Sequence, residues 1–307
     1  MFRNVLGDDV FRAGLKKYLV KHSFGSAAAE DLMRALQEAY DEGANGKTPL
    51  SVKETMTSWL VQPGHPTLNV IRNYTTGATR VVQESTVGLA DNGTLINTTS
   101  KWWIPLTYAT QSALNLSSTM PTSWMSDKEE SVTIDGIGKD DWVIFNVQWT
   151  GFYRVKYDEE NMNRIVNYLN TDNYKNIHVL NRAQLISDAS YLVDLSLEQH
   201  IGDFYKITKY LSREVEYPPW CAARDVIRTL NEKLSGTEVY EIFQRYVVGL
   251  MNALVEKVGF EDRENEDLLT LSARRDIVGW ACASGHSGCS QFAAENLVKF
   301  VENPTTD

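Results

Sequence analysis

The sequence predicts a multidomain α+β chain in which a helical segment, a small β-sandwich and a longer α-helical segment follow one another. Two observations support this fold class. Apolar residues recur with a helical period up to about residue 66, and they do so again after residue 157. Between these segments, short β-branched and aromatic runs alternate with turn residues. Three domains are therefore predicted, at 1–66, 67–157 and 158–307.

The first segment contains three expected helices. Two apolar stripes are formed by Phe11, Leu15, Tyr18 and Leu19, and then by Leu32, Ala35, Leu36 and Ala39. A third helix is expected to begin at Ser51, which forms an S-x-x-E capping box with Glu54. Pro63 and Gly64 are expected to end this helix.

The middle segment has the sequence pattern of a β-sandwich. Its runs are TLNVIRNY, TRVVQEST, WWIPLTYAT, SVTI, WVIFNVQ and GFYRVKY. In the last run, one predicted face carries Phe152, Arg154 and Lys156, and the other carries Tyr153, Val155 and Tyr157. So many short strands in so few residues are typical of a small sandwich.

The last segment reads as consecutive helices without strands. Asp158 is placed to cap the first of them, and Ser196 with Gln199 forms a second capping-box pattern. Helices that follow one another in pairs favour an α-solenoid with HEAT-like stacking. The sequence period is too weak to define repeats by self-similarity.

The bulk composition excludes several classes of partner. The net charge of −10 argues against nucleic acid and against anionic membrane surfaces. No apolar run approaches the roughly 18 residues of a membrane span, so no membrane-spanning segment is expected. The N-terminus carries Arg3, Asp8 and Asp9 where a signal peptide would have its apolar core.

Four N-glycosylation sequons lie between residues 73 and 115. Their acceptors are Asn73, Asn92, Asn97 and Asn115. About three sequons are expected by chance in a chain of this composition, so the number alone shows nothing. Their clustering in one Thr-rich region makes all four glycosylation candidates, which matter only if the chain enters the secretory pathway.

No catalytic or metal-binding motif stands in the sequence. The five histidines include no pair at the four-residue spacing of HExxH, and there is no nucleophile elbow or phosphate-binding loop. The segment GIGKDD at 136–141 reads as a turn, and the acidic run EDRENED at 261–267 reads as a solvated loop or helix start. No catalytic residue and no metal ligand is assigned.

The three cysteines leave alternatives open. Cys282 and Cys289 are separated by a glycine-containing turn, so a helix–turn–helix could join them in a disulfide. Two reduced thiols packed as small hydrophobic groups fit the spacing equally well. Zinc binding is disfavoured because no second thiol pair is near. Cys221, beside Trp220, is interpreted as a buried structural thiol.

Several colinear segments resemble the aminopeptidase N family, the gluzincin zinc aminopeptidases. They are KKYLVKHSFGSAAAEDLMRAL (16–36), TSWLVQPGHPTLNV (57–70), KWWIPLTYAT (101–110), WVIFNVQWTGFYRVKYD (142–158), VLNRAQLISDASYLVDLSL (179–197) and REVEYPPWCAARDV (213–226). Within this family, the sequence most resembles the insect gut-surface type. The resemblance runs in order over almost the whole chain, to about Cys289.

The resemblance implies that this chain is a C-terminal portion of a longer enzyme. Residues 1–66 would be the helical end of a catalytic domain, and 158–307 a truncated superhelical domain. The HExxH site, its distal glutamate ligand and the exopeptidase loop would lie upstream, so zinc would belong to the full-length parent and this chain alone would be inactive. The resemblance also implies a Cys282–Cys289 disulfide.

Further expectations follow from the resemblance. The parent would use zinc to remove N-terminal residues from peptides at the extracellular face of the plasma membrane, and this portion would pack on the catalytic domain and wall the substrate cavity. Helices 1–66 would then expose an apolar face in the isolated chain. Its residues would be Phe11, Leu15, Leu32, Leu36, Met56 and Trp59.

Two alternatives remain at this point. In the first, the chain is a binding module or receptor surface, for example for insecticidal crystal toxins, because a solenoid offers a large concave surface. In the second, it is a cytosolic scaffold with free thiols at Cys282 and Cys289 and no glycans. The scaffold leaves the ordered series of motifs unexplained.

Overall fold

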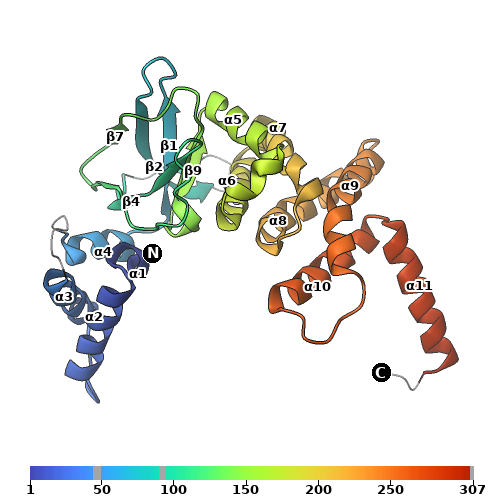
Figure 1. Cartoon of the computed structure of the whole chain (residues 1–307), viewed down its shortest axis with the longest axis horizontal. Coiled ribbons are helices and arrows are strands. Elements are labelled where there is room, and N and C mark those ends of the chain that lie inside the picture. The colour runs from blue at the N-terminus through green and yellow to red at the C-terminus, as the bar shows by residue number, and fades with distance from the viewer. Residues whose placement is uncertain (44–49, 90–94, 98, 305–307) are drawn as a thin grey trace. The chain divides into compact units, whose positions relative to one another are not determined.

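The chain is mostly helical, with a small sheet region. The computed structural model describes residues 1–43, 50–89, 95–97 and 99–304, and within these it has eleven α-helices and nine strands. Contacts divide the chain into two compact units (Figure 1). The first unit comprises Met1–Tyr168 and Asn176–Asn181, and the second comprises Leu169–Lys175 and the chain from Arg182 onward.

The first unit holds the N-terminal helices, all strands of the described residues, and helix α5. Its helices are α1 (Phe2–Leu6), α2 (Asp8–Lys21), α3 (Ala29–Glu42), α4 (Val52–Leu60) and α5 (Glu159–Leu169). Its strands are β1 (His65–Arg72), β2 (Thr79–Leu89), β3 (Leu95–Asn97), β4 (Ile104–Leu106), β5 (Tyr108–Thr110), β6 (Ser123–Met125), β7 (Ser131–Ile134), β8 (Val143–Phe145) and β9 (Arg154–Tyr157).

Within its described residues, the second unit contains helices joined by loops and no strand. Helix α6 (Val179–Leu195) leads into it from the first unit. The helices that follow are α7 (Leu197–Thr208), α8 (Tyr217–Leu234), α9 (Tyr240–Val258), α10 (Leu268–Ala283) and α11 (Ser287–Glu302). From α8 to α11, each helix packs on its neighbour in the chain.

Helices α1 to α4 form a small core of their own. Val5, Leu6, Leu36 and Val52 are all buried in it. Helices α2 and α3 approach so closely at Gly14 that an added Cβ there would lie 2.9 Å from the Cα of Leu36. Only glycine leaves room for that contact, because real Cβ atoms are not found so near a backbone atom.

The predicted exposed apolar face of residues 1–66 is wrong. Leu36 and Met56 are buried, and Phe11, Leu15, Leu32 and Trp59 are half-buried. The helices cover these side chains by packing on one another, and the Trp59 Nε1 donates to the carbonyl of Trp103 at 2.8 Å. Large apolar side chains are instead exposed near the end of α2, at Leu19, Val20 and Phe24.

The strands form one larger sheet and two pairs. The larger sheet has the order β3-β2-β1-β9, with β7 also paired to β2, and the smaller ones are β4-β6 and β5-β8. Strands β1 and β9 are parallel although more than eighty residues of chain separate them, with Leu68 opposite Val155 and Val70 opposite Tyr157. These four side chains are buried, so the register places one apolar face against the core.

The alternation predicted for residues 152–157 is confirmed. Tyr153, Val155 and Tyr157 are buried, whereas Phe152 is exposed and Arg154 is half-buried. Two predicted helix caps are confirmed as well. The Ser51 hydroxyl accepts from the backbone N–H of Glu54 at 3.3 Å, and Asp158 accepts from that of Asn161 at 2.8 Å, which is the geometry of N-caps.

A tight turn before β9 depends on one asparagine. Asn146 is fully buried and has a left-handed backbone with φ of 65°. Its side-chain Nδ2 donates to the carbonyls of Gly151 and Tyr153, and its Oδ1 accepts from the N–H of Gly151 at 2.7 Å. The Asn146 carbonyl accepts from the Asn181 side chain, which ties the turn to the start of α6.

Candidate functional site

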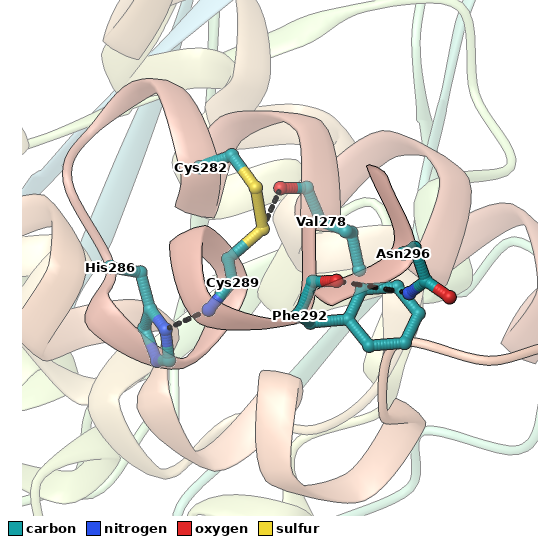
Figure 2. The surroundings of a disulfide bond; sticks show 6 residues. All are labelled: Val278, Cys282, His286, Cys289, Phe292 and Asn296. Atoms are coloured by element: carbon teal, nitrogen blue, oxygen red, sulfur yellow. Dashed lines mark hydrogen bonds between the residues drawn. A yellow bond between two sulfur atoms is a disulfide. The ribbon is translucent and has the colours of Figure 1, made fainter. Parts of the chain in front are cut away.

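A disulfide joins α10 to α11. Cys282 and Cys289 are bonded with Cα atoms 5.1 Å apart, and the side chain of Cys289 is fully buried (Figure 2). Helix α10 ends in a turn where Gly285 has φ of 82°, a conformation that favours glycine. The reduced-thiol alternative for this pair is therefore not what the structure has.

A histidine begins the helix that carries Cys289. The Nδ1 of His286 accepts from the backbone N–H of Cys289 at 3.2 Å, so His286 is the N-cap of α11 (Figure 2). The His286 ring also contacts Phe260, which stacks on Phe292 with ring centroids 5.3 Å apart. The disulfide is thus one of several contacts that hold the turn between α10 and α11.

We expect the Cys282→Ala/Cys289→Ala variant to lose about 2–3 kcal/mol of local stability, because the crosslink no longer restricts a short loop in the unfolded chain. The measurement is hydrogen exchange of 268–302 in the oxidised chain and in the variant. Cys221→Ala serves as the matched control, since Cys221 is a free thiol. Unchanged exchange of 268–302 in the double variant would contradict this prediction.

A buried ion pair lies at the start of the second unit. The Arg182 Nε donates to the Glu214 carboxylate at 2.6 Å, and the two side chains are 4% and 0% exposed. Glu214 also accepts from the backbone N–H groups of Val215 and Glu216, and its carbonyl accepts from the Trp220 indole. A buried charge requires such partners, so this pair fixes the connection between α6 and α8.

The ring of Tyr174 lies beside two guanidinium groups. The Cζ atoms of Arg182 and Arg213 are 5.3 and 5.4 Å from its ring centroid. The Tyr174 hydroxyl donates to the carbonyl of Arg213 at 2.7 Å. Burial raises the pKa of Tyr174, and the nearby Glu214 carboxylate adds to this shift. At neutral pH the hydroxyl is therefore protonated, as its donation to the Arg213 carbonyl requires.

A second polar cluster joins β1 to α5 in the first unit. The nearly buried Arg72 donates to the carbonyls of Gly138 and Asp141. Asp158 accepts from the Tyr74 hydroxyl and from the backbone N–H of Arg72. Burial and the Asp158 hydrogen bond raise the pKa of Tyr74 well above its usual value. The turn predicted at 136–141 supplies these carbonyls.

The acidic run 261–267, predicted to be a solvated loop or a helix start, is an exposed loop that ends at the start of α10. Asp267 is the N-cap of α10, accepting from the N–H groups of Leu269 and Thr270. Glu266 pairs with Arg274, whose guanidinium also donates to the carbonyl of Val258. The hydrogen bond from Arg274 lowers the pKa of Glu266 to about 2. These contacts bind the loop to α10.

The structure places two of the four predicted sequon asparagines on the surface. Asn73 follows β1 at the hairpin turn, and Asn115 lies in the loop after β5, both exposed. Asn97 is the last residue of β3. Asn92 lies outside the described residues.

The histidines do not assemble a metal site. His22 lies 3.8 Å from Asp31, His65 packs edge-on against Phe152, and His178 Nδ1 accepts from a backbone N–H. Within the described ranges, no group of three or more His, Cys, Asp or Glu side chains could hold a metal ion. Over the same ranges, no helix is both long and apolar enough to cross a membrane.

Hollows lie within each unit. One of about 420 Å³ in the first unit is lined by residues 149–154 with Met1 and His65. Another, of about 200 Å³, lies among α8, α9 and α10 beside Phe243, Met251 and Trp280. Neither hollow can be predicted from the sequence, because the residues that line each come from segments far apart in the chain.

Two family models match the chain in order. Residues 1–59 match the Peptidase family M1 domain, and residues 142–307, more than half of the chain, match the ERAP1-like C-terminal domain. The fold and these matches define the C-terminal region of an M1-type peptidase. The chain belongs to the aminopeptidase N family and corresponds to the C-terminal part of its members.

Individual relatives agree with this placement. The chain is 33% identical to aminopeptidase N of Plutella xylostella, over 99% of this chain and 32% of that protein. It is 32% identical to the human thyrotropin-releasing hormone-degrading ectoenzyme, over 99% and 29%. It is 31% identical to membrane alanyl aminopeptidase of Heliothis virescens, over 94% and 28%. The chain thus spans about a third of the length of these relatives.

The zinc that the family uses does not fit the residues described here. The described histidines contact aromatic rings, a carboxylate or backbone groups, and no set of ligands converges. We therefore derive no step of peptide hydrolysis from this chain's own side chains.

Proposed function

We propose that this chain is the non-catalytic, C-terminal portion of a zinc-dependent membrane aminopeptidase. It packs on the catalytic domain of the parent and helps to wall the cavity in which peptides lose their N-terminal residues. The observation that carries this proposal is the order of the two family matches. A short M1 peptidase segment comes first, and an ERAP1-like C-terminal domain follows it in the same chain.

The proposed domain division follows from this role. Residues 1–66 complete the catalytic domain, residues 67–157 act as a spacer, and residues 158–307 begin a HEAT-like superhelix. Sequential packing of α8 on α9, α9 on α10 and α10 on α11 supports such stacking. The buried Arg182–Glu214 pair gives the superhelix a fixed starting geometry, as a cavity wall requires.

The proposed location is the extracellular face of the plasma membrane, where parts of the parent outside this chain would anchor it. Two relatives carry the words "ectoenzyme" and "membrane" in their names. A Cys282–Cys289 disulfide suits an oxidising compartment. Nothing within the described residues supports toxin binding, so the receptor alternative is not proposed.

A chimera tests the function. We would replace the corresponding third of Plutella xylostella aminopeptidase N with this chain and compare it with an enzyme cut at the position of residue 158. The chimera is expected to hydrolyse N-terminal residues with zinc. The cut enzyme should lose activity or its discrimination between short and long peptides, measured as the ratio of their kcat/KM values.

Two results would oppose the proposal. One is a cut enzyme with full activity and an unchanged length preference. The other is zinc-dependent release of N-terminal residues by the present chain alone, which would require a metal site within it. Zinc content measured on the purified chain provides the control for the second result.

A further inference from the structure

The sequons at Asn73 and Asn115 share a side-chain arrangement in which the acceptor asparagine is exposed on the surface. In each, the asparagine and the hydroxyl residue are exposed, and the residue between them packs on the first unit, where Tyr74 is half-buried and Leu116 is buried. We propose that Asn73 and Asn115 both carry N-linked glycans. This inference rests on the proposed extracellular location, because glycan transfer occurs only in the secretory pathway.

The first sequon is Asn73-Tyr74-Thr75. The Oδ1 of exposed Asn73 accepts from the N–H groups of Thr75 and Thr76, at 2.9 and 3.1 Å, which forms an Asx turn. Its Nδ2, the atom that would receive the sugar, has no partner within the described residues. Attachment of a sugar to the Asn73 Nδ2 would therefore break no hydrogen bond within the described residues.

Tyr74 anchors this turn. Its hydroxyl donates to Asp158, and the guanidinium groups of Arg72 and Arg164 lie 5.0 and 4.6 Å from its ring centroid. The middle residue of the sequon is thereby fixed on the inner side. Because the chain turns at this point, the flanking Asn73 and Thr75 are left exposed.

The second sequon is Asn115-Leu116-Ser117. Leu116 is buried against Ala109 and Val147, and its carbonyl accepts from the side chain of Gln148. The Ser117 hydroxyl donates to the Oδ1 of Asn115 at 3.3 Å, so the acceptor amide and the sequon hydroxyl are already adjacent. The Asn115 Nδ2 has no partner within the described part of the chain.

The chemistry is a glycosyl transfer from a lipid-linked oligosaccharide pyrophosphate. The Nδ2 of asparagine attacks the anomeric carbon and forms the N–C bond, while the bond from that carbon to the pyrophosphate oxygen breaks. The lipid pyrophosphate leaves, and the amide nitrogen gives up one proton to solvent. Because the glycan is added before the chain folds, the acceptor must end on the surface of the folded chain, as Asn73 and Asn115 do.

The experiment uses the full 307-residue chain fused behind a heterologous signal sequence and secreted from insect cells. Peptide-N-glycosidase treatment in heavy-oxygen water converts each glycosylated asparagine to labelled aspartate, which peptide mapping locates. Label at both Asn73 and Asn115 is expected. Secreted, folded chain with no label at one of them overturns the proposal for that site.

Matched variants separate glycan loss from misfolding. Thr75→Val and Ser117→Ala should each remove one glycan while the asparagine stays, and Thr75→Ser should retain it. Folding is checked by the near-ultraviolet circular dichroism of each secreted variant. The signal sequence forces entry into the secretory pathway, so this test succeeds or fails independently of the chimera that tests the proposed function.

Discussion

Replacing Arg182 with methionine is expected to destabilise the second unit by about 3–5 kcal/mol. The change keeps much of the buried volume but leaves the Glu214 carboxylate, which is 0% exposed, without its counter-ion. Two backbone N–H groups still donate to that carboxylate, yet they do not neutralise its charge. The measurement is the urea midpoint, together with hydrogen exchange of α6 and α8.

A second change should restore most of this loss. In Arg182→Met/Glu214→Gln the buried charge is gone, while a side-chain oxygen remains to accept from Val215 and Glu216. The matched control is Arg228→Met, because Arg228 pairs with Asp225 on the surface, where both side chains are more than 60% exposed. We expect that control to change stability by no more than about 0.5 kcal/mol.

The pair would be shown unimportant by either of two outcomes. Arg182→Met could unfold at the same urea concentration as the Arg228 control, or the double variant could be no more stable than the single one. The first outcome would mean that water or another cation compensates Glu214, so that the start of the second unit does not depend on this contact. The second would mean that the unpaired Glu214 charge is not what destabilises the single variant.

Replacing Asn146 with alanine is expected to destabilise the first unit by at least about 3 kcal/mol. Three side-chain hydrogen bonds, two to Gly151 and one to Tyr153, disappear from a fully buried turn. Alanine also tolerates the left-handed backbone, with φ of 65°, less well than asparagine, at a cost of about 1–2 kcal/mol. The measurement is urea unfolding of Asn146→Ala and of the unchanged 307-residue chain.

Two matched variants separate these contributions. Asn146→Gly loses the same hydrogen bonds but accepts the backbone, so it should recover about 1 kcal/mol relative to alanine. Asn265→Ala tests the backbone effect alone, because Asn265 also has a positive φ of 62° but is exposed. If Asn146→Ala were no worse than Asn265→Ala, the buried hydrogen bonds would not be what holds the turn.

The sequence by itself predicted much of the local structure. The 3.6-residue and two-residue periods indicated where helices and strands lie, since each side chain's direction follows from its own neighbours in the chain. The caps at Ser51 and Asp158 could be read for the same reason, because donor and acceptor are three residues apart.

Contacts between distant residues could not be read in that way. The parallel pairing of β1 with β9 and the covering of the apolar face of residues 1–66 arise only when distant segments meet. Arg182 and Glu214 are 32 residues apart in the chain, and Asn146 lies within the run WVIFNVQ, which is predicted as a strand. Their roles depend on burial and on a backbone conformation that no local pattern encodes.

The same distinction between local pattern and tertiary structure applies to the cysteines and the sequons. Sequence spacing left a disulfide and two free thiols equally acceptable at Cys282 and Cys289, and the turn between α10 and α11 decided between them. The sequon motif marks an asparagine from three consecutive residues, whereas only the fold shows that Tyr74 and Leu116 hold their neighbours outward. The chain's own residues thus set its local conformation, and the packing of distant segments set which side chains are buried, paired or exposed.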